Sequence, residues 1–140
     1  MNKLKFFFLF WIIFSFSDVK AELSNFEMGK NLFDEEKYDL AKFKFEQDIV
    51  YNPKNEKSYL YLAKIYKFKK NDNQEENNLN TVILLNPKNE EAILNLAFLK
   101  IRKSNYKETE KLINDFKKIC KELCKQTSDL QKKLDAVLKK

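Results

Sequence analysis

The two cysteines, Cys120 and Cys124, are the side chains of this sequence with the most distinctive chemistry, because a pair of thiols can be oxidised to a disulfide. Their spacing is not that of the Cys-x-x-Cys motif of redox enzymes. On one straight helix the two thiols share a face and are poorly placed for the torsion angle that a disulfide prefers. We therefore expect Cys120 to be a small buried apolar residue, while Cys124 lies at the edge of that face and could cross-link two chains.

The rest of the chain has few residues that could take part in catalysis. The sequence has no His, which removes the commonest general base and metal ligand, and its single Gly cannot build a phosphate-binding loop. Two pairs of adjacent acids, Glu35 with Glu36 and Glu75 with Glu76, point apart on a helix, so we expect all four to be solvated. The sequence predicts no enzyme, no catalytic residue, no metal site and no cofactor.

A repeat indicates which elements position these residues. The tetrapeptide Asn-Pro-Lys-Asn occurs at 52–55 and again at 86–89, 34 residues later. Self-similarity at such a period is typical of stacked helix-turn-helix units, and a chain with one Gly and two Pro has little turn chemistry for a sheet. We predict an all-α solenoid with units at 22–55, 56–89 and 90–125 and a C-terminal capping helix at 126–140.

Single polar residues predict the helix starts. Asn55 and Asn89 are predicted N-caps, because an Asn side chain accepts hydrogen bonds from the free amides of a first turn, and Glu follows each of them there. Ser24 is the predicted cap of the first helix, with Glu27 completing a capping box. The prolines end the incoming helices, so the repeated tetrapeptide is a joint that needs no binding role.

Apolar residues recur at helical spacing inside each unit. The first helices of the second and third units carry core stripes at Tyr59, Leu62, Ala63 and Tyr66, and at Ile93, Leu96 and Ala97. The second helices present Ala41, Phe45 and Ile49; Leu79, Val82 and Ile83; and Leu112, Ile113 and Phe116. We expect the small Ala63 and Ala97 to allow close approach between helices.

Towards the carboxyl end the apolar residues repeat every seven positions, as Ile113, Cys120, Thr127 and Leu134 and as Phe116, Leu123, Leu130 and Val137. This heptad seam permits one long helix from Asn105, capped there with Glu108, or two helices broken near 127–129, where cap-forming residues cluster. The segment either covers the open end of the last unit or pairs with a second chain as a coiled coil, and we favour the cover.

In this register the sequence resembles the tetratricopeptide repeat (TPR) family from residue 22 to about 120; the family pattern is W-x2-L-G-x2-Y, then A-x3-F, then a late Pro. The matching residues are Gly29, Leu32, Ala41, Phe45 and Pro53; Tyr59, Leu62, Ala63, Tyr66, Leu79 and Pro87; and Ile93, Leu96, Ala97, Ile113 and Phe116. Glu75 and Thr109 fill slots where the family has a small residue, and Lys100 fills one where an aromatic is usual.

The resemblance implies that the first helices line a groove that binds peptides or helices of partner proteins. The implied groove residues are Phe26, Lys30, Phe33, Leu60, Lys64, Lys67, Phe68, Leu94, Phe98, Ile101 and Arg102. Their mixture of apolar and cationic side chains suits a protein or peptide ligand with apolar and acidic residues. Leu60, Leu94 and Phe98 could instead pack against neighbouring units. The Lys/Asn/Arg clamp by which some family members hold a chaperone's carboxyl terminus is not reproduced, since other residues occupy four of its slots: Phe26, Tyr61, Glu91 and Asn95.

The amino terminus indicates export. Lys3 and Lys5 precede an almost wholly apolar run at 6–16, and Val19-Lys20-Ala21 has the small-x-small pattern that a signal peptidase cleaves. The 12 residues between Lys5 and Asp18 are too few for a membrane anchor, which needs roughly 20. We predict a signal peptide at 1–21 and a periplasmic or secreted mature protein, with membrane association only through an uncleaved signal segment or weakly through a basic carboxyl end.

Charge is unevenly distributed along the chain. The formal net charge is +6, and residues 100–140 carry 13 basic and 6 acidic side chains, against 11 and 14 in residues 22–99. A solvated helix face explains this basic end better than a binding patch does, and no nucleic-acid partner is expected of an exported chain. The leading hypothesis is an exported TPR adaptor or scaffold. The alternatives are a structural subunit that forms a homo-oligomer through the heptad helix, and a basic binder of the envelope surface.

Overall fold

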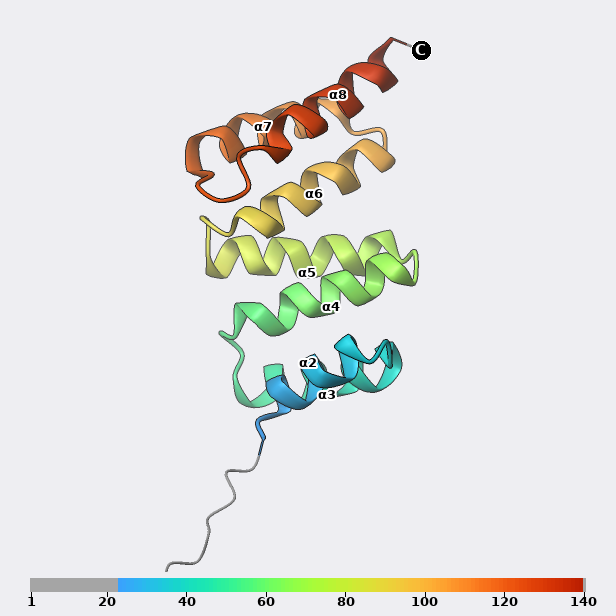
Figure 1. The fold of residues 1–140 in the computed structure, drawn as a ribbon, viewed down its shortest axis with the longest axis vertical. Coiled ribbons are helices and arrows are strands. Elements are labelled where there is room, and N and C mark those ends of the chain that lie inside the picture. The colour runs from blue at the N-terminus through green and yellow to red at the C-terminus, as the bar shows by residue number, and fades with distance from the viewer. Residues whose placement is uncertain (1–22, 140) are drawn as a thin grey trace, which may run out of the picture.

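The computed structural model describes residues 23–139, so the predicted signal peptide at 1–21 lies outside the described residues. Seven helices occupy the described part: α2 (Asn25–Asp34), α3 (Tyr38–Tyr51), α4 (Glu56–Phe68), α5 (Asp72–Leu85), α6 (Glu90–Arg102), α7 (Tyr106–Ile119) and α8 (Gln126–Leu138). Helices that follow one another in the chain pack side by side and stack into an elongated solenoid (Figure 1). The prediction of an all-α solenoid is confirmed.

Polar side chains cap the helices at the predicted positions. Ser24 accepts a hydrogen bond from the amide of Glu27 at 3.1 Å, and Asn89 accepts one from the amide of Ala92 at 2.9 Å. Asn55 and Asn105 are further predicted caps of the same kind, and Asn71 is a cap that was not predicted from the sequence. Because each cap satisfies an amide that has no partner inside its helix, these helix starts are determined by local sequence.

The turn inside each unit has the same backbone three times. Glu36, Lys70 and Ser104 have φ angles of 60°, 55° and 56°, in the left-handed region. After each of them the next amide bonds a carbonyl five residues earlier, as from Asn71 N to Tyr66 O at 2.9 Å, which is the Schellman pattern. Glycine usually occupies such a position, so this chain accepts the steric cost of a side chain there. The 34-residue period is therefore present in the backbone as well as in the tetrapeptide.

Carboxylates hold the joints between units. At the first joint the buried Asp48 accepts a hydrogen bond from the Ser58 hydroxyl at 2.6 Å. At the second joint Glu56 accepts hydrogen bonds from the side-chain amides of Asn86 at 3.0 Å and Asn89 at 3.4 Å. Each joint is thus fixed by side-chain hydrogen bonds in addition to its proline.

Small residues allow the closest helix packing. Ala63 and Ala97 are buried, as the sequence predicts. A Cβ atom at Gly29 would lie 2.8 Å from the ring of Phe45, so α2 can approach α3 this closely only because residue 29 is Gly. The buried apolar residues form three clusters, each of which joins one unit to the next element of the solenoid. Among the described helices, none combines the length and the apolar character needed to span a membrane.

The C-terminal segment forms two helices. Helix α7 ends at Ile119, and Cys120 has an extended backbone with ψ 141°. The break lies at 120–125, a few residues before the predicted 127–129, which belong to the first turn of α8, and the predicted C-terminal helix at 126–140 begins where α8 does. Helix α8 covers α6 and α7 and buries the heptad seam inside the chain at Ile113, Phe116, Leu130 and Leu134.

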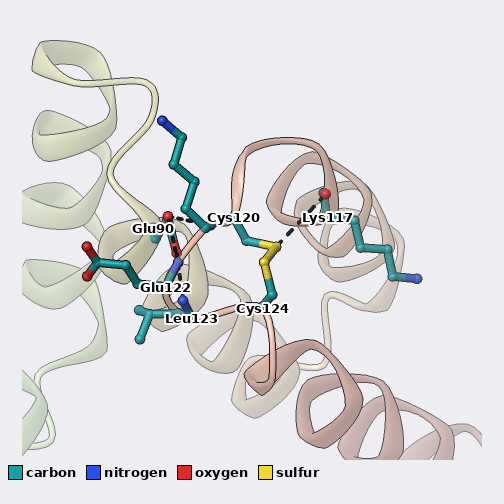
Figure 2. Close-up of a disulfide and its surroundings, with 7 residues drawn as sticks. Glu90, Lys117, Cys120, Glu122, Leu123 and Cys124 are labelled. Atoms are coloured by element: carbon teal, nitrogen blue, oxygen red, sulfur yellow. Dashed lines mark hydrogen bonds between the residues drawn. A yellow bond between two sulfur atoms is a disulfide. The ribbon is translucent and has the colours of Figure 1, made fainter.

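A disulfide joins Cys120 and Cys124 across this break, with their Cα atoms 5.2 Å apart (Figure 2). The expectations of a free buried thiol at Cys120 and of an intermolecular link at Cys124 are therefore wrong. They assumed a continuous helix. Since the helix ends at Ile119, the chain turns back and brings the two thiols together.

Candidate functional site

Two hollows lie beside the first helices α4 and α6. The first hollow has a volume of about 410 Å³ and lies between α2, α4, α5 and α6. Its wall consists of Phe33, Leu60, Ala63, Lys64, Lys67, Phe68, Glu75, Leu79, Glu91 and Asn95. Half of these residues are apolar, and the volume is sufficient for a large apolar side chain of a ligand.

Aromatic side chains form one side of the first hollow. The rings of Phe33 and Phe68 have their centroids 6.2 Å apart, and the Phe68 ring stacks on Tyr38 at 4.8 Å. Phe68 nevertheless remains 59% exposed. An exposed aromatic that its neighbours hold in place at the edge of a hollow is the type of residue that dominates protein interfaces.

The second hollow is also about 410 Å³ in volume and lies between the ends of α4 and α6 and the start of α8. Its wall consists of Lys67, Phe98, Ile101, Arg102, Gln126, Asp129 and Lys133. The Lys133 ammonium lies 4.5 Å from the centre of the Phe98 ring and 3.4 Å from the Asp129 carboxylate. Helix α8 therefore forms one wall of this hollow in addition to covering the last unit.

Lys67 lines both hollows and is electrostatically different from the other cations there. Lys64 pairs with Glu91 at 2.8 Å, and Arg102 and Lys133 also have carboxylate partners. Lys67 forms no salt bridge within residues 23–139; its ammonium donates a hydrogen bond to Asn95 Oδ1 at 3.3 Å. A cation that forms no salt bridge with the described residues thus lies where the two hollows meet, although it is near enough to Glu75 to lower the pKa of that carboxyl group.

Glu75 lies at the wall of the first hollow and is only 1% exposed. Its Oε2 accepts a hydrogen bond from Arg102 at 2.6 Å, while Oε1 has no hydrogen-bond partner within the described residues. Burial raises the pKa of Glu75, and the neighbouring Arg102 opposes this shift. The prediction that Glu75 is solvated is wrong, because the slot that it fills lies between helices and is occupied by the buried Ala41 in the first unit.

Glu76 is also not solvated as predicted, because two lysines of α6 reach it. Lys100 and Lys103 each donate a hydrogen bond to it at 2.6 Å, and Lys100 is held from the other side by Glu108 at 2.8 Å. Hydrogen bonds from the two lysines lower the pKa of Glu76. Lys100, which replaces the usual aromatic of the repeat, is thereby buried with its charge compensated.

The predicted groove residues fall into three sets. The first hollow contains Phe33, Leu60, Lys64, Lys67 and Phe68, and the second contains Lys67, Phe98, Ile101 and Arg102. The remaining three lie elsewhere. Phe26 packs against Phe45 and Tyr61, Lys30 pairs with Asp34, and Leu94 is buried in the core.

Sequence reasoning missed other residues of the two hollows. Glu91 and Asn95 were recognised only as occupants of clamp slots of the family; they lie on the face of α6 that also carries Phe98, at helical spacing, so the period could have identified them as groove residues. Gln126, Asp129 and Lys133 gave no local signal, because their place depends on the turn of the chain at 120–125. Within residues 23–139 no cluster of His, Cys, Asp or Glu could hold a metal ion.

Known structures share this fold at low sequence identity. The TPR2B-domain:pHsp70 complex of yeast Sti1 aligns with a TM-score of 0.71 and 15% identity, over 77% of this chain and 90% of that one. The first TPR domain of Spaghetti (RPAP3), bound to the HSP90 peptide SRMEEVD, aligns with a TM-score of 0.72 and 20% identity, over 81% of this chain and 90% of that one. No family model and no curated protein matches the sequence. The predicted resemblance to TPR repeats is confirmed at the level of the fold.

Proposed function

We propose that this chain is an exported, non-enzymatic adaptor that binds a segment of a partner protein along the two hollows, which together we call the groove. The TPR fold supports the proposal, because both structural neighbours have titles that name a bound chaperone ligand. We do not transfer their ligands to this chain. In its groove Lys64 already forms a salt bridge with Glu91 and is therefore not free to bind an acidic group of a ligand.

Lys67 is the observation on which the proposed ligand chemistry rests. It lies where the two hollows meet, and every other cation of the groove already has a carboxylate partner. An acidic residue of the ligand would satisfy Lys67 while flanking apolar side chains enter the hollows beside Phe68 and Phe98. The proposed ligand is therefore an extended segment with an acidic residue between two large apolar ones.

Site-specific cross-linking tests the groove. A photoreactive amino acid at position 68 or 98 should capture the same partner in the native cell, and mass spectrometry should locate the linked segment. The control position is Leu84, which is 82% exposed on α5 and lines neither hollow. Capture from position 84 alone, or a linked segment without an acidic residue, would contradict the proposal.

Affinity for a synthetic peptide of the captured segment tests the role of Lys67. Lys67→Gln should weaken binding by roughly tenfold or more, because a charge-assisted hydrogen bond contributes about 1.5 to 3 kcal/mol. Lys57→Gln is the matched control, since Lys57 is exposed on the same helix and lines neither hollow. Equal affinities of the two variants would remove Lys67 from the site.

Export is supported by the signal-like amino terminus together with the disulfide, because disulfides persist mainly in oxidising compartments. The amino-terminal sequence of the protein purified from the envelope or the medium should begin at Glu22 or within a few residues of it. A full-length protein recovered from the cytosol would overturn the localisation but leave the groove proposal intact.

A further inference from the structure

The loop between α7 and α8 surrounds the carboxylate of Glu90 (Figure 2). The amide of Lys121 donates to Oε1 at 2.7 Å, the amide of Leu123 donates to Oε2 at 2.8 Å, and Glu122 donates to Oε2 at 3.2 Å. Three successive amides that converge on one anion form a nest, and they do so only while the loop keeps this curvature. Glu90 is the first residue of α6, so the nest fastens the loop to the start of that helix.

The disulfide closes the same loop. Cys120 precedes the three donating amides and Cys124 follows them, and the bond keeps their Cα atoms 5.2 Å apart. With the bond present, the backbone between the cysteines has few alternatives to the curved form. With two thiols instead, the loop can extend, and the three amides can hydrogen-bond to water.

The loop determines where α8 begins. Gln126 follows directly, and its amide bonds Leu123 O at 2.8 Å. One face of α8 buries Leu130 and Leu134 in the core, and Gln126, Asp129 and Lys133 form a wall of the second hollow. Among the described helices, only α4 and α6 line this hollow besides α8, so a displaced α8 would open the second hollow on one side.

We propose that oxidation of Cys120 and Cys124 controls the groove: with the disulfide formed, α8 is held as its wall, and with the thiols reduced, α8 opens more often and leaves the second hollow without this wall. This inference rests on the proposed function and adds its regulation. The two thiols give two electrons and two protons to an external disulfide, that of a thiol-disulfide oxidoreductase or of oxidised glutathione. One S–S bond forms in the loop while the other is cleaved to two thiols.

Export would change the redox state of the two cysteines. In a reducing cytosol the chain keeps both thiols, and no disulfide holds α8 as a wall of the groove. After export the disulfide forms and completes the second hollow. The chain would therefore bind its partner more tightly in the compartment where the loop is oxidised.

Hydrogen exchange followed by mass spectrometry tests, without any ligand, whether the disulfide holds α8 in place. The mature protein is measured oxidised, after reduction, and as the Cys120→Ser/Cys124→Ser variant. Amides of α8 should exchange at least about tenfold faster in the last two samples, because a loop that is no longer closed permits local opening. Amides of α4 should not change. Equal protection of α8 in all three samples would overturn the proposal.

A second readout separates this inference from the proposed function. A photoreactive residue at position 98 samples the second hollow, and one at position 68 samples the first. In the Cys120→Ser/Cys124→Ser background the yield of cross-linked partner at position 98 should fall relative to that at position 68. Equal yields with and without the disulfide would overturn the regulation alone. Absence of any cross-link in the oxidised protein would contradict the adaptor function, while the exchange experiment would still decide whether the disulfide holds α8.

Discussion

The joint at 86–89 and the loop at 120–125 occupy equivalent places in successive units, yet they hold the chain by different means. Each is bound by a carboxylate from the start of its unit, Glu56 in one case and Glu90 in the other, and these two residues are 34 apart. In the joint, Glu56 accepts hydrogen bonds from two Asn side chains, and a proline restricts the backbone. In the loop, Glu90 accepts hydrogen bonds from backbone amides, and a disulfide restricts the chain.

The difference shows which connection can be regulated. Proline at 87 has no amide to donate and no alternative chemical state, so the joint has one geometry in every compartment. The loop requires its amides and depends on two thiols whose state follows the redox environment. The loop at 120–125 thus contains redox-active cysteines at a place in the repeat where the joint at 86–89 has none.

Removal of the disulfide should have the largest effect. The Cys120→Ser/Cys124→Ser variant should lose about 2 kcal/mol, the chain-entropy value for so short a loop, and the loss should concentrate in α8. Urea unfolding of the oxidised protein and of the variant measures it, with exchange at α8 to locate it. A loss spread evenly over α2 to α8 would mean that the loop stabilises the whole solenoid and does not control α8 separately.

Local patterns in the sequence predicted the joints but not the loop. Asn55 and Asn89 were identifiable as caps because a cap acts on amides two or three residues away. The end of α7 was not identifiable, since Lys121, Glu122 and Leu123 are ordinary helix formers. They turn because Glu90, more than 30 residues earlier, accepts their hydrogen bonds.

In the candidate site, too, some features could be predicted from the sequence and others could not. The family resemblance, together with helical spacing, predicted Lys64, Lys67 and Phe68 as groove residues, and all three line the first hollow. The burial of Glu75 did not follow, although its slot was recognised as one for a small residue. Its partner Arg102 is 27 residues away and meets it only after two helices have stacked.

The carboxylates of loop and joint can be compared by matched substitutions. Glu90→Gln should destabilise the protein more than Glu56→Gln, because it weakens bonds from three backbone amides, whereas the two Asn side chains of the joint can turn towards water. Both residues begin a helix, so their interactions with the helix dipole are alike. Urea unfolding of both variants at one pH provides the comparison, and a larger loss for Glu56→Gln would reverse the ranking.

The pH dependence of stability should differ in sign between Glu90, which the nest binds, and the buried Glu75. Hydrogen bonds from the loop amides, Leu123 first, lower the pKa of Glu90 below its ordinary 4.5, so its contribution is present above that value and is lost as the pH falls below it. Burial raises the pKa of Glu75, so its contribution is lost as the pH rises above 4.5. The free energy of unfolding is measured from about pH 3 to about pH 7. Glu90→Gln should flatten the acidic part of this pH profile, and Glu75→Gln should flatten the part towards neutral pH. Identical profiles for both variants would exclude these assignments.

The smallest effect is expected at the joint itself. Pro87→Ala should cost about 0.4 to 1 kcal/mol, because proline reduces the freedom of the unfolded chain and Asn86 already has the extended backbone that a following proline favours, with φ −140° and ψ 91°. Pro53→Ala should cost a similar amount, since the first joint has the same sequence and the same hydrogen bond, from Asn55 N to Asn52 O at 2.9 Å. Neither variant should alter exchange at α8, because neither joint is part of the nest. If Pro87→Ala loosened α8 as strongly as reduction does, the joint and the loop would be mechanically coupled, and the independent control of the groove by its disulfide would have to be abandoned.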